Sequence, residues 1–218
     1  MKYLHLYALS LMFAFCTFHE QSQTDPAKAN ASSKTKDTVP PYRPVDPGIY
    51  SKYEFTDSIG KRLVIQNSLP RGGRYTDPNG KNHAYAVFWT RIINETNNPL
   101  EATINFPVDS FEVPSSPAVY MKLLLPPDTM TMNKVTLYDY GLKIKSVLDN
   151  YRYQASSSKR TIYPKTSIAF YVVAFSDRGV NGVLRTEFRL KEQDLFYRIN
   201  DKEIPCGRIN VKNLRLKE

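Results

Sequence analysis

Apolar and polar side chains alternate along several short segments, and the clearest of these is residues 100–106. Leu100, Ala102, Ile104 and Phe106 fall on one face, and polar side chains occupy the positions between them. A period of two is that of a half-buried antiparallel strand. We therefore expect a β-strand here whose apolar face points toward a core.

A longer apolar run covers residues 84–93, and both of its faces carry large side chains, including Trp89. Residues 94–99 are rich in Asn and end in Pro, which indicates a turn. We expect residues 84–93 and 100–106 to form a hairpin, with Trp89 buried between two sheets.

Similar patterns predict strands in eight further segments: 52–56, 63–66, 118–125, 135–138, 167–175, 183–190, 195–199 and 208–216. Residues 167–175 are apolar on both faces, which predicts a central strand, and helical spacing predicts one short helix over residues 142–148. Short strands with turn residues between them favour an all-β fold: an immunoglobulin-like antiparallel β-sandwich with at most one or two short helices.

The segment INETNNPL, residues 93–100, resembles the strand–turn–strand of immunoglobulin-like domains in bacterial envelope proteins. True immunoglobulin domains add two cysteines around a tryptophan. Trp89 is present here, but those two cysteines are not.

The N-terminal residues 1–18 carry the features of an export signal. Lys2 supplies a positive charge, and an almost unbroken apolar run of about a dozen residues follows, shorter than the ~20 residues that a membrane-spanning helix needs. Cys16 ends this run, which resembles the signal of a bacterial lipoprotein, whose cysteine becomes lipid-modified. Ala14 fits that pattern, whereas Phe13 and Phe15 depart from it.

Two alternatives stay open for this segment: cleavage at residues 27–29 or 29–31 with soluble secretion, or an uncleaved anchor. Residues 19–48 carry little apolar mass and end in a Pro-rich stretch, which predicts a disordered tether. We expect one β-sandwich domain over residues 49–218, in a bacterial cell envelope (outer membrane or periplasm). The second cysteine, Cys206, lies in an apolar turn and is expected to be buried.

The charge of the chain is uneven. Its net charge is +9, and residues 46–142 carry nine Lys/Arg against ten Asp/Glu, whereas residues 143–218 carry sixteen against eight, a net of +8. A basic region can bind anionic glycans or lipid headgroups, or it can be a solvated face without a partner. No feature of the sequence indicates nucleic-acid binding.

Tyrosines and arginines gather in the same region, and they make up the candidate ligand-binding set. Tyrosine can stack on sugars, and arginine can contact anions. The set is Tyr138, Tyr140, Tyr151, Arg152, Tyr153, Arg160 and Tyr163. The alternative is that these are ordinary residues of a sheet edge.

The sequence contains little that would support an enzymatic function. His83 is the only histidine beyond residue 19, and no catalytic triad, zinc or nucleotide motif accompanies it. Residues 77–82 favour a β-turn over a calcium loop. We assign no metal and no cofactor. Carboxylates that a glycosidase would need are present at Asp109, Glu112, Asp128 and Asp139.

The sequence therefore favours a non-enzymatic envelope lipoprotein that binds a ligand or another envelope protein, with a glycan-acting hydrolase as the alternative. Three tripeptides, at residues 37–39, 57–59 and 128–130, resemble the Asp-(Ser/Thr)-aliphatic acceptor of a bacterial O-glycosylation system.

Overall fold

The computed structural model describes residues 48–211 and 215–216, apart from residues 108, 153 and 155. The expected export signal, Cys16 and all of the expected tether except Gly48 lie outside the described residues. So does the tripeptide at residues 37–39.

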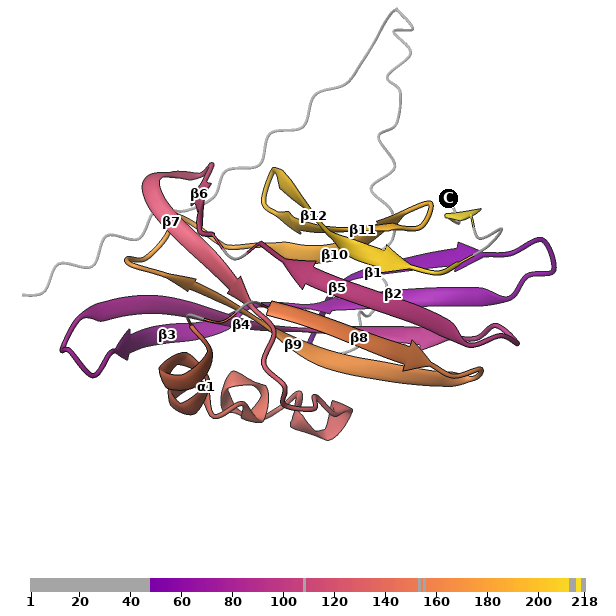
Figure 1. Cartoon of the computed structure of the whole chain (residues 1–218), viewed down its shortest axis with the longest axis horizontal. Helices are drawn as coiled ribbons and strands as arrows, with labels where there is room; N and C mark the ends of the chain where they lie inside the picture. Colours follow the sequence, from indigo (N-terminus) through magenta and orange to yellow (C-terminus); the bar gives the residue numbers. More distant parts are fainter. Residues whose placement is uncertain (1–47, 108, 153, 155, 212–214, 217–218) are drawn as a thin grey trace, which may run out of the picture. The chain divides into compact units, whose positions relative to one another are not determined.

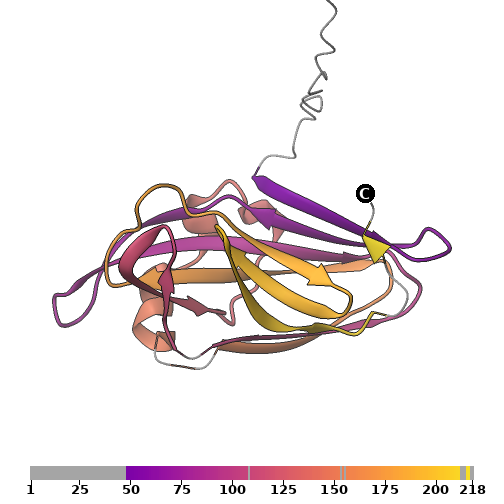
Figure 2. The same ribbon diagram turned by 90° about the horizontal axis from the view of Figure 1, so that it is seen from above.

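Two antiparallel sheets pack face to face (Figures 1 and 2). The larger sheet has eight strands in the order β13-β1-β2-β4-β9-β7-β6, with β3 also paired to β4. Their bounds are β1 Ile49–Thr56, β2 Arg62–Ser68, β3 Arg71–Thr76, β4 Asn82–Asn94, β6 Phe111–Val113, β7 Ser116–Leu124, β9 Thr166–Ser176 and β13 Arg215–Leu216. The prediction of an antiparallel β-sandwich is confirmed.

The smaller sheet has five strands in the order β10-β11-β12-β5-β8. Their bounds are β5 Leu100–Phe106, β8 Ser156–Ile162, β10 Thr186–Lys191, β11 Asp194–Ile199 and β12 Lys202–Ile209. The edge strand β10 is capped from the other sheet by Asn67, whose side-chain oxygen accepts from Phe188 N at 2.9 Å and whose amide donates to Phe188 O at 3.3 Å. One side chain thus takes the place of a neighbouring strand at this edge.

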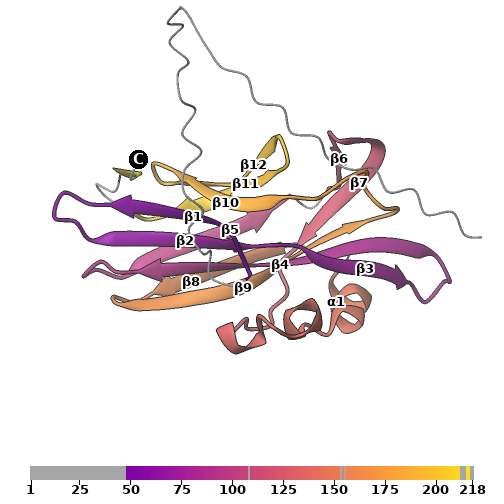
Figure 3. The same ribbon diagram turned by 180° about the vertical axis from the view of Figure 1, so that it is seen from behind.

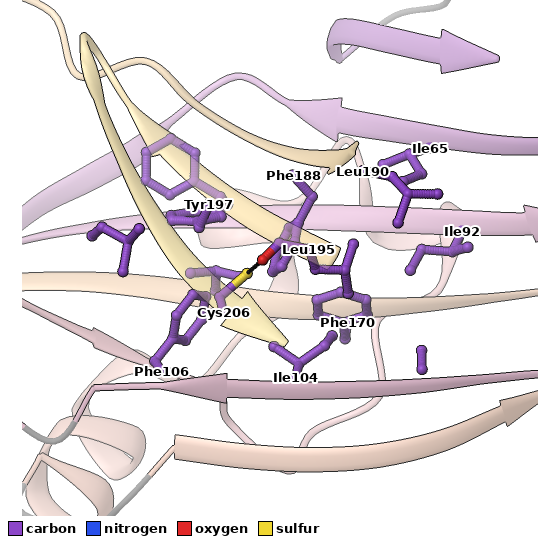
Figure 4. Close-up of a cluster of buried hydrophobic side chains, with 14 of the residues drawn as sticks. Ile65, Ile92, Ile104, Phe106, Phe170, Phe188, Leu190, Leu195, Tyr197 and Cys206 are labelled. Carbon is purple, nitrogen blue, oxygen red and sulfur yellow. Dashed lines mark hydrogen bonds between the residues drawn. The ribbon is translucent and has the colours of Figure 1, made fainter. Parts of the chain in front are cut away.

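The inner core lies between the two sheets, and Figure 4 shows part of it. Phe188 is at its centre, with ring centroids 4.8 Å from Tyr197, 5.5 Å from Phe170 and 6.0 Å from Phe106. Cys206 is buried in this core and its thiol contacts Leu195 O at 3.4 Å, so its predicted burial is confirmed. Burial raises the pKa of the Cys206 thiol, which makes it a poor nucleophile.

The outer face of the larger sheet is covered by the connection between β7 and β8 (Figures 1 and 3). This connection contains two 3₁₀ turns, η1 (Met132–Lys134) and η2 (Tyr138–Gly141), and one helix, α1 (Ile144–Tyr151). A second core, which we call the outer core, lies beneath it and includes Trp89, Tyr140, Tyr171, Val147 and Leu148. The larger sheet is therefore buried on both faces along its central strands.

Several patterns read from the sequence are confirmed. β5 alternates between buried and exposed residues along its whole length, and β9 is the apolar central strand between β4 and β7. The expected short helix is α1, which begins two residues and ends three residues later than predicted. The turn at residues 77–80 is also confirmed, since Gly80 N donates to Asp77 O at 2.9 Å.

Three predictions are wrong. β4 and β5 do not form a hairpin, because residues 95–99 carry the chain from one sheet to the other. Trp89 is buried, but under the β7–β8 connection and not between the sheets. Residues 135–138 form no strand: residues 135–137 link η1 to η2, which begins at Tyr138. Val135 packs against the core under this connection and Leu137 is half exposed, so the two do not form the buried face of a strand.

Candidate functional site

A hollow of about 370 Å³ lies on the outer face of the larger sheet, beside the end of α1. We call it the outer-face hollow. Its lining residues are His83, Asp109, Ser110, Tyr120, Lys122, Arg152, Phe175, Ser176 and Asp177. The volume falls in the range of small-molecule sites.

Strand alternation explains why side chains so distant in sequence meet here. Met121 and Leu123 of β7 point into the inner core, so Tyr120 and Lys122 point to the outer face. β7 pairs with the end of β9, where Lys122 lies opposite Phe175. His83 enters from the start of β4, which also pairs with β9.

One wall of the hollow is held by a buried ionic cluster. Asp77 Oδ2 accepts from Arg152 Nη1 at 3.0 Å and lies 3.4 Å from His83 Nε2. Each of the three side chains is less than a tenth exposed. Asp77 Oδ1 accepts from the backbone amides of Asn79 and Lys81, both at 2.9 Å, so the carboxylate also fixes the β3–β4 turn.

These contacts keep Asp77 ionised. The Lys81 backbone hydrogen bond is the largest cause, and together with the Arg152 and His83 contacts it lowers the pKa of Asp77 to about 2. Arg152 is thereby fixed in position, because its guanidinium is bonded to a permanent anion. Asp77 thus serves to orient His83 and Arg152 along the hollow.

The hollow combines aromatic surface with polar groups. Tyr120 is about half exposed, and the Phe175 ring lies 4.7 Å from the His83 ring. Lys122 makes no ion pair with any described residue, whereas Asp177 lies 3.5 Å from Arg178. His83 Nδ1 and Asp177 Oδ1 are buried without a hydrogen-bond partner in the described part of the chain. Unbonded buried atoms of this kind suit a site that takes up a polar ligand or water.

Two smaller hollows are less suited to a ligand. One, of about 270 Å³, contains Arg198 and Glu187, which pair with each other at 3.5 Å, and Tyr50, which is covered by Arg185. The other, of about 200 Å³, is lined by Asp57, Thr96, Asn98, Pro99, Leu100, Asn210 and Val211 and has no aromatic residue. We therefore assign the candidate site to the outer-face hollow.

The candidate ligand-binding residues predicted from the sequence do not lie together in the structure. Tyr140 lies in the outer core, and Arg160 is half-buried with its guanidinium 5.8 Å from the Phe170 ring centroid. Tyr138 and Tyr163 are strongly exposed, on η2 and on the β8–β9 turn. Among the members of the set whose side chains the structure describes, only Arg152 lines the outer-face hollow. Tyr151 ends α1, and Tyr153 lies outside the described residues.

The candidate carboxylates are also dispersed. Asp109 lines the outer-face hollow. Glu112 accepts from Ala118 N at 2.7 Å, Asp139 is buried and accepts from Tyr85, and Asp128 is exposed. The second carboxylate of the hollow is Asp177, which we did not select from the sequence because its neighbours carry no motif.

Several basic residues of the C-terminal third form ion pairs with nearby acids. Ion pairs form between Lys159 and Glu101, Arg189 and Glu187, Lys191 and Glu203, and Arg208 and Asp194. Acids therefore lie among the bases of this region, but three of these four acids are already counted in its net +8, so the pairs do not remove that excess.

No protein-family model, curated protein or solved structure matches this chain. Within the described residues, no three His, Cys, Asp or Glu side chains are grouped to hold a metal ion. None of the helices described there has the length and apolar character to cross a membrane.

Proposed function

We propose that this protein is an exported, non-enzymatic binding module of a bacterial cell envelope, and that it binds an acidic sugar in the outer-face hollow. The observation that carries the proposal is the joint presence there of Tyr120, Lys122 and Arg152. An exposed tyrosine ring offers a stacking surface for a sugar, and fixed cations suit its carboxylate or sulfate.

The polar remainder of the hollow fits the same ligand. Asp109, Ser110 and Asp177 can accept hydrogen bonds from sugar hydroxyls, and His83 Nδ1 can form the bond that it lacks. A mixed lining of this kind favours a ligand with one anionic group and several hydroxyls over a purely anionic one.

The test is a calorimetric titration of the full chain with acidic and neutral oligosaccharides. Tyr120→Ala and Lys122→Ala should each weaken binding of the acidic ligand roughly tenfold, because one stacking surface or one charged hydrogen bond is lost. Matched controls are Tyr163→Ala and Lys61→Ala, which lie away from the hollow and should leave binding unchanged. Equal affinity in all four variants would refute the proposal.

Salt provides a second readout of the same titration. The contribution of Lys122 should shrink as ionic strength rises, since the Debye length falls from ~10 Å at 0.1 M to ~3 Å at 1 M. The contribution of Tyr120 should persist, because stacking is not screened.

A second function has one specific observation in its favour. Asp109 and Asp177 line the same hollow, and two carboxylates flanking a sugar are what a glycoside hydrolase requires. If the protein is a hydrolase, the full chain releases reducing ends from an oligosaccharide, and both Asp109→Asn and Asp177→Asn abolish that release. A binding module releases none.

The cellular location is part of the proposal and rests on residues 1–48. We propose a lipid anchor at Cys16, a tether and an immunoglobulin-like domain, the last on the resemblance of residues 93–100. Cells given a labelled fatty acid should label the wild-type protein and not Cys16→Ser. Unlabelled wild-type protein in the medium would favour soluble secretion instead.

A further inference from the structure

A group of exposed apolar side chains lies at the other end of the β7–β8 connection. Tyr138 is 77% exposed and Leu137 is 50% exposed, and Leu69 of the β2–β3 link is also exposed. Leu69 O accepts from Tyr140 OH at 2.7 Å, which places Leu69 next to η2. We call Leu69, Leu137 and Tyr138 the η2 patch.

The backbone of η2 forces these side chains outward. Asp139 and Tyr140 both have positive φ, 44° and 54°, which is uncommon for residues with side chains and costs conformational energy. Their side chains point inward: Tyr85 OH donates to Asp139 Oδ2 at 2.7 Å, and Tyr140 is only 1% exposed. The turn therefore buries Asp139 and Tyr140 and leaves the preceding Leu137 and Tyr138 exposed to solvent.

Other contacts hold the displayed residues in place. Arg71 donates to Leu137 O and lies over the Tyr140 ring, 4.3 Å from its centroid. Tyr171 OH donates to Tyr140 O at 2.8 Å. Exposed apolar side chains on a rigid turn keep their apolar surface in water, which is unfavourable unless something covers it.

The charges around the η2 patch differ from those elsewhere. Arg71 and Lys134 lie beside it: Arg71 donates to Leu137 O, and a Cβ placed on Gly141 would meet both Leu137 and Lys134. Lys143 follows η2 by two residues in the chain. None of these three side chains forms an ion pair with a described carboxylate, whereas Lys159, Arg189, Lys191 and Arg208 do. The one acid within η2, Asp139, is buried and bonded to Tyr85. Arg71 and Lys134 therefore place positive charge beside the η2 patch without a paired carboxylate.

The η2 patch also lies next to Gly48, the first described residue, which follows residues 1–47 in the chain. Leu69 N donates to Gly48 O at 3.4 Å, and a Cβ placed on Gly48 would lie 2.7 Å from Val135 Cγ1. Those 47 residues contain the apolar run of residues 7–18 and Cys16.

From these observations we propose that the η2 patch inserts into the headgroup region of an anionic membrane. Apolar tips flanked by cations match the chemistry of a bilayer surface, where aromatic rings settle at the headgroup level and each cation is attracted to anionic lipids. This surface is separate from the outer-face hollow, so the proposal does not depend on the ligand proposed above.

The test places a reporter in the patch of the full chain. The protein has a single tryptophan, Trp89, which is fully buried and gives a constant background. Tyr138→Trp adds an exposed indole, and Tyr163→Trp is the matched control, since Tyr163 is 65% exposed on the β8–β9 turn. Both are mixed with vesicles of phosphatidylcholine alone or of equal phosphatidylcholine and phosphatidylglycerol, each containing doxyl-labelled lipid.

With the anionic vesicles, the emission of Tyr138→Trp should shift to the blue and be quenched, whereas that of Tyr163→Trp should not. Lys143→Glu, added to Tyr138→Trp, should lower partitioning to anionic vesicles roughly tenfold, because reversing one charge removes an attraction and adds a repulsion. Lys61→Glu is its control and should have a smaller effect.

The local reporter separates the η2 patch from any membrane binding by residues 1–47. If those residues alone bind the vesicles, both tryptophan variants co-sediment with them but neither is quenched differently from the other, and the proposal is overturned. Absence of quenching with the anionic vesicles overturns it as well, and leaves the η2 patch to a protein partner.

Discussion

The two faces of the larger sheet are buried in different ways. Its inner face packs on the smaller sheet through a core of Phe, Leu, Ile and Val, in which Tyr197 is the only fully buried tyrosine. Its outer face packs on the β7–β8 connection through Trp89 and four buried tyrosines: Tyr75, Tyr85, Tyr140 and Tyr171. Each of those four hydroxyls donates a hydrogen bond, to Asp149, Asp139, Leu69 O and Tyr140 O, respectively.

This difference separates two tasks. Apolar contacts are not directional. The inner core therefore stabilises the fold, and the arrangement of its side chains is set by packing and not by hydrogen bonds. Hydrogen bonds fix distances and angles, so the outer core sets the geometry of η2 and α1. Both the outer-face hollow and the η2 patch border the outer core, where that geometry is useful.

The largest expected effect comes from removing the main aromatic of either core. Phe188→Ala and Trp89→Ala should each lower the free energy of unfolding by about 3–5 kcal/mol, because each ring is fully buried. Urea unfolding measures the loss. Hydrogen exchange should distinguish the two: Trp89→Ala should accelerate exchange mainly in α1, and Phe188→Ala across both sheets.

Uniform acceleration over the whole domain in Trp89→Ala would show that the outer core is not a separate layer. The control is Tyr163→Ala, whose side chain is exposed and whose loss should change stability little.

A smaller effect is expected from single hydroxyl groups. Tyr85→Phe removes the hydroxyl that donates to the buried Asp139 carboxylate, and should cost about 2–3 kcal/mol. Tyr197→Phe is the inner-core counterpart. It removes a hydrogen bond to the neutral Thr186 hydroxyl and should lower the free energy of unfolding by about 1 kcal/mol. Equal costs, measured by urea unfolding, would contradict the idea that polar contacts matter more on the outer face.

The sequence predicted local features better than long-range ones. The alternation in β5 and the two apolar faces of β9 were sufficient to predict strands, because burial follows directly from the period. β8, SSSKRTI, and β3, RGGRYT, were missed because they carry few apolar residues and rely on backbone pairing with β5 and β4. The crossing from β4 to β5 was missed for a related reason: a turn between two strands does not say which sheet the second one joins.

The candidate site was harder to predict for the same physical reason. Asp77 and Arg152 lie 75 positions apart, and their ion pair arises only when α1 ends beside the β3–β4 turn. Tyr120 and Asp177 become neighbours of Arg152 through strand register. The sequence did single out Arg152, but its partners could not be inferred from spacing.

The smallest expected effect is a pH dependence of stability that comes from the outer core. Burial raises the pKa of Tyr171 to about 12 in the folded protein, against ~10 in an unfolded chain. The raised value stabilises the fold fully below pH ~10, and this contribution is lost as the pH rises toward 12, because the unfolded chain ionises first. At pH 10.5 the loss from this one tyrosine should be on the order of 1 kcal/mol. Urea unfolding of wild type and Tyr171→Phe at pH 8 and pH 10.5 measures it: the variant loses a hydrogen bond at both pH values, but its stability should fall less between them. An identical fall in both proteins would mean that the Tyr171 hydroxyl reaches solvent and that the cover over the outer face opens readily.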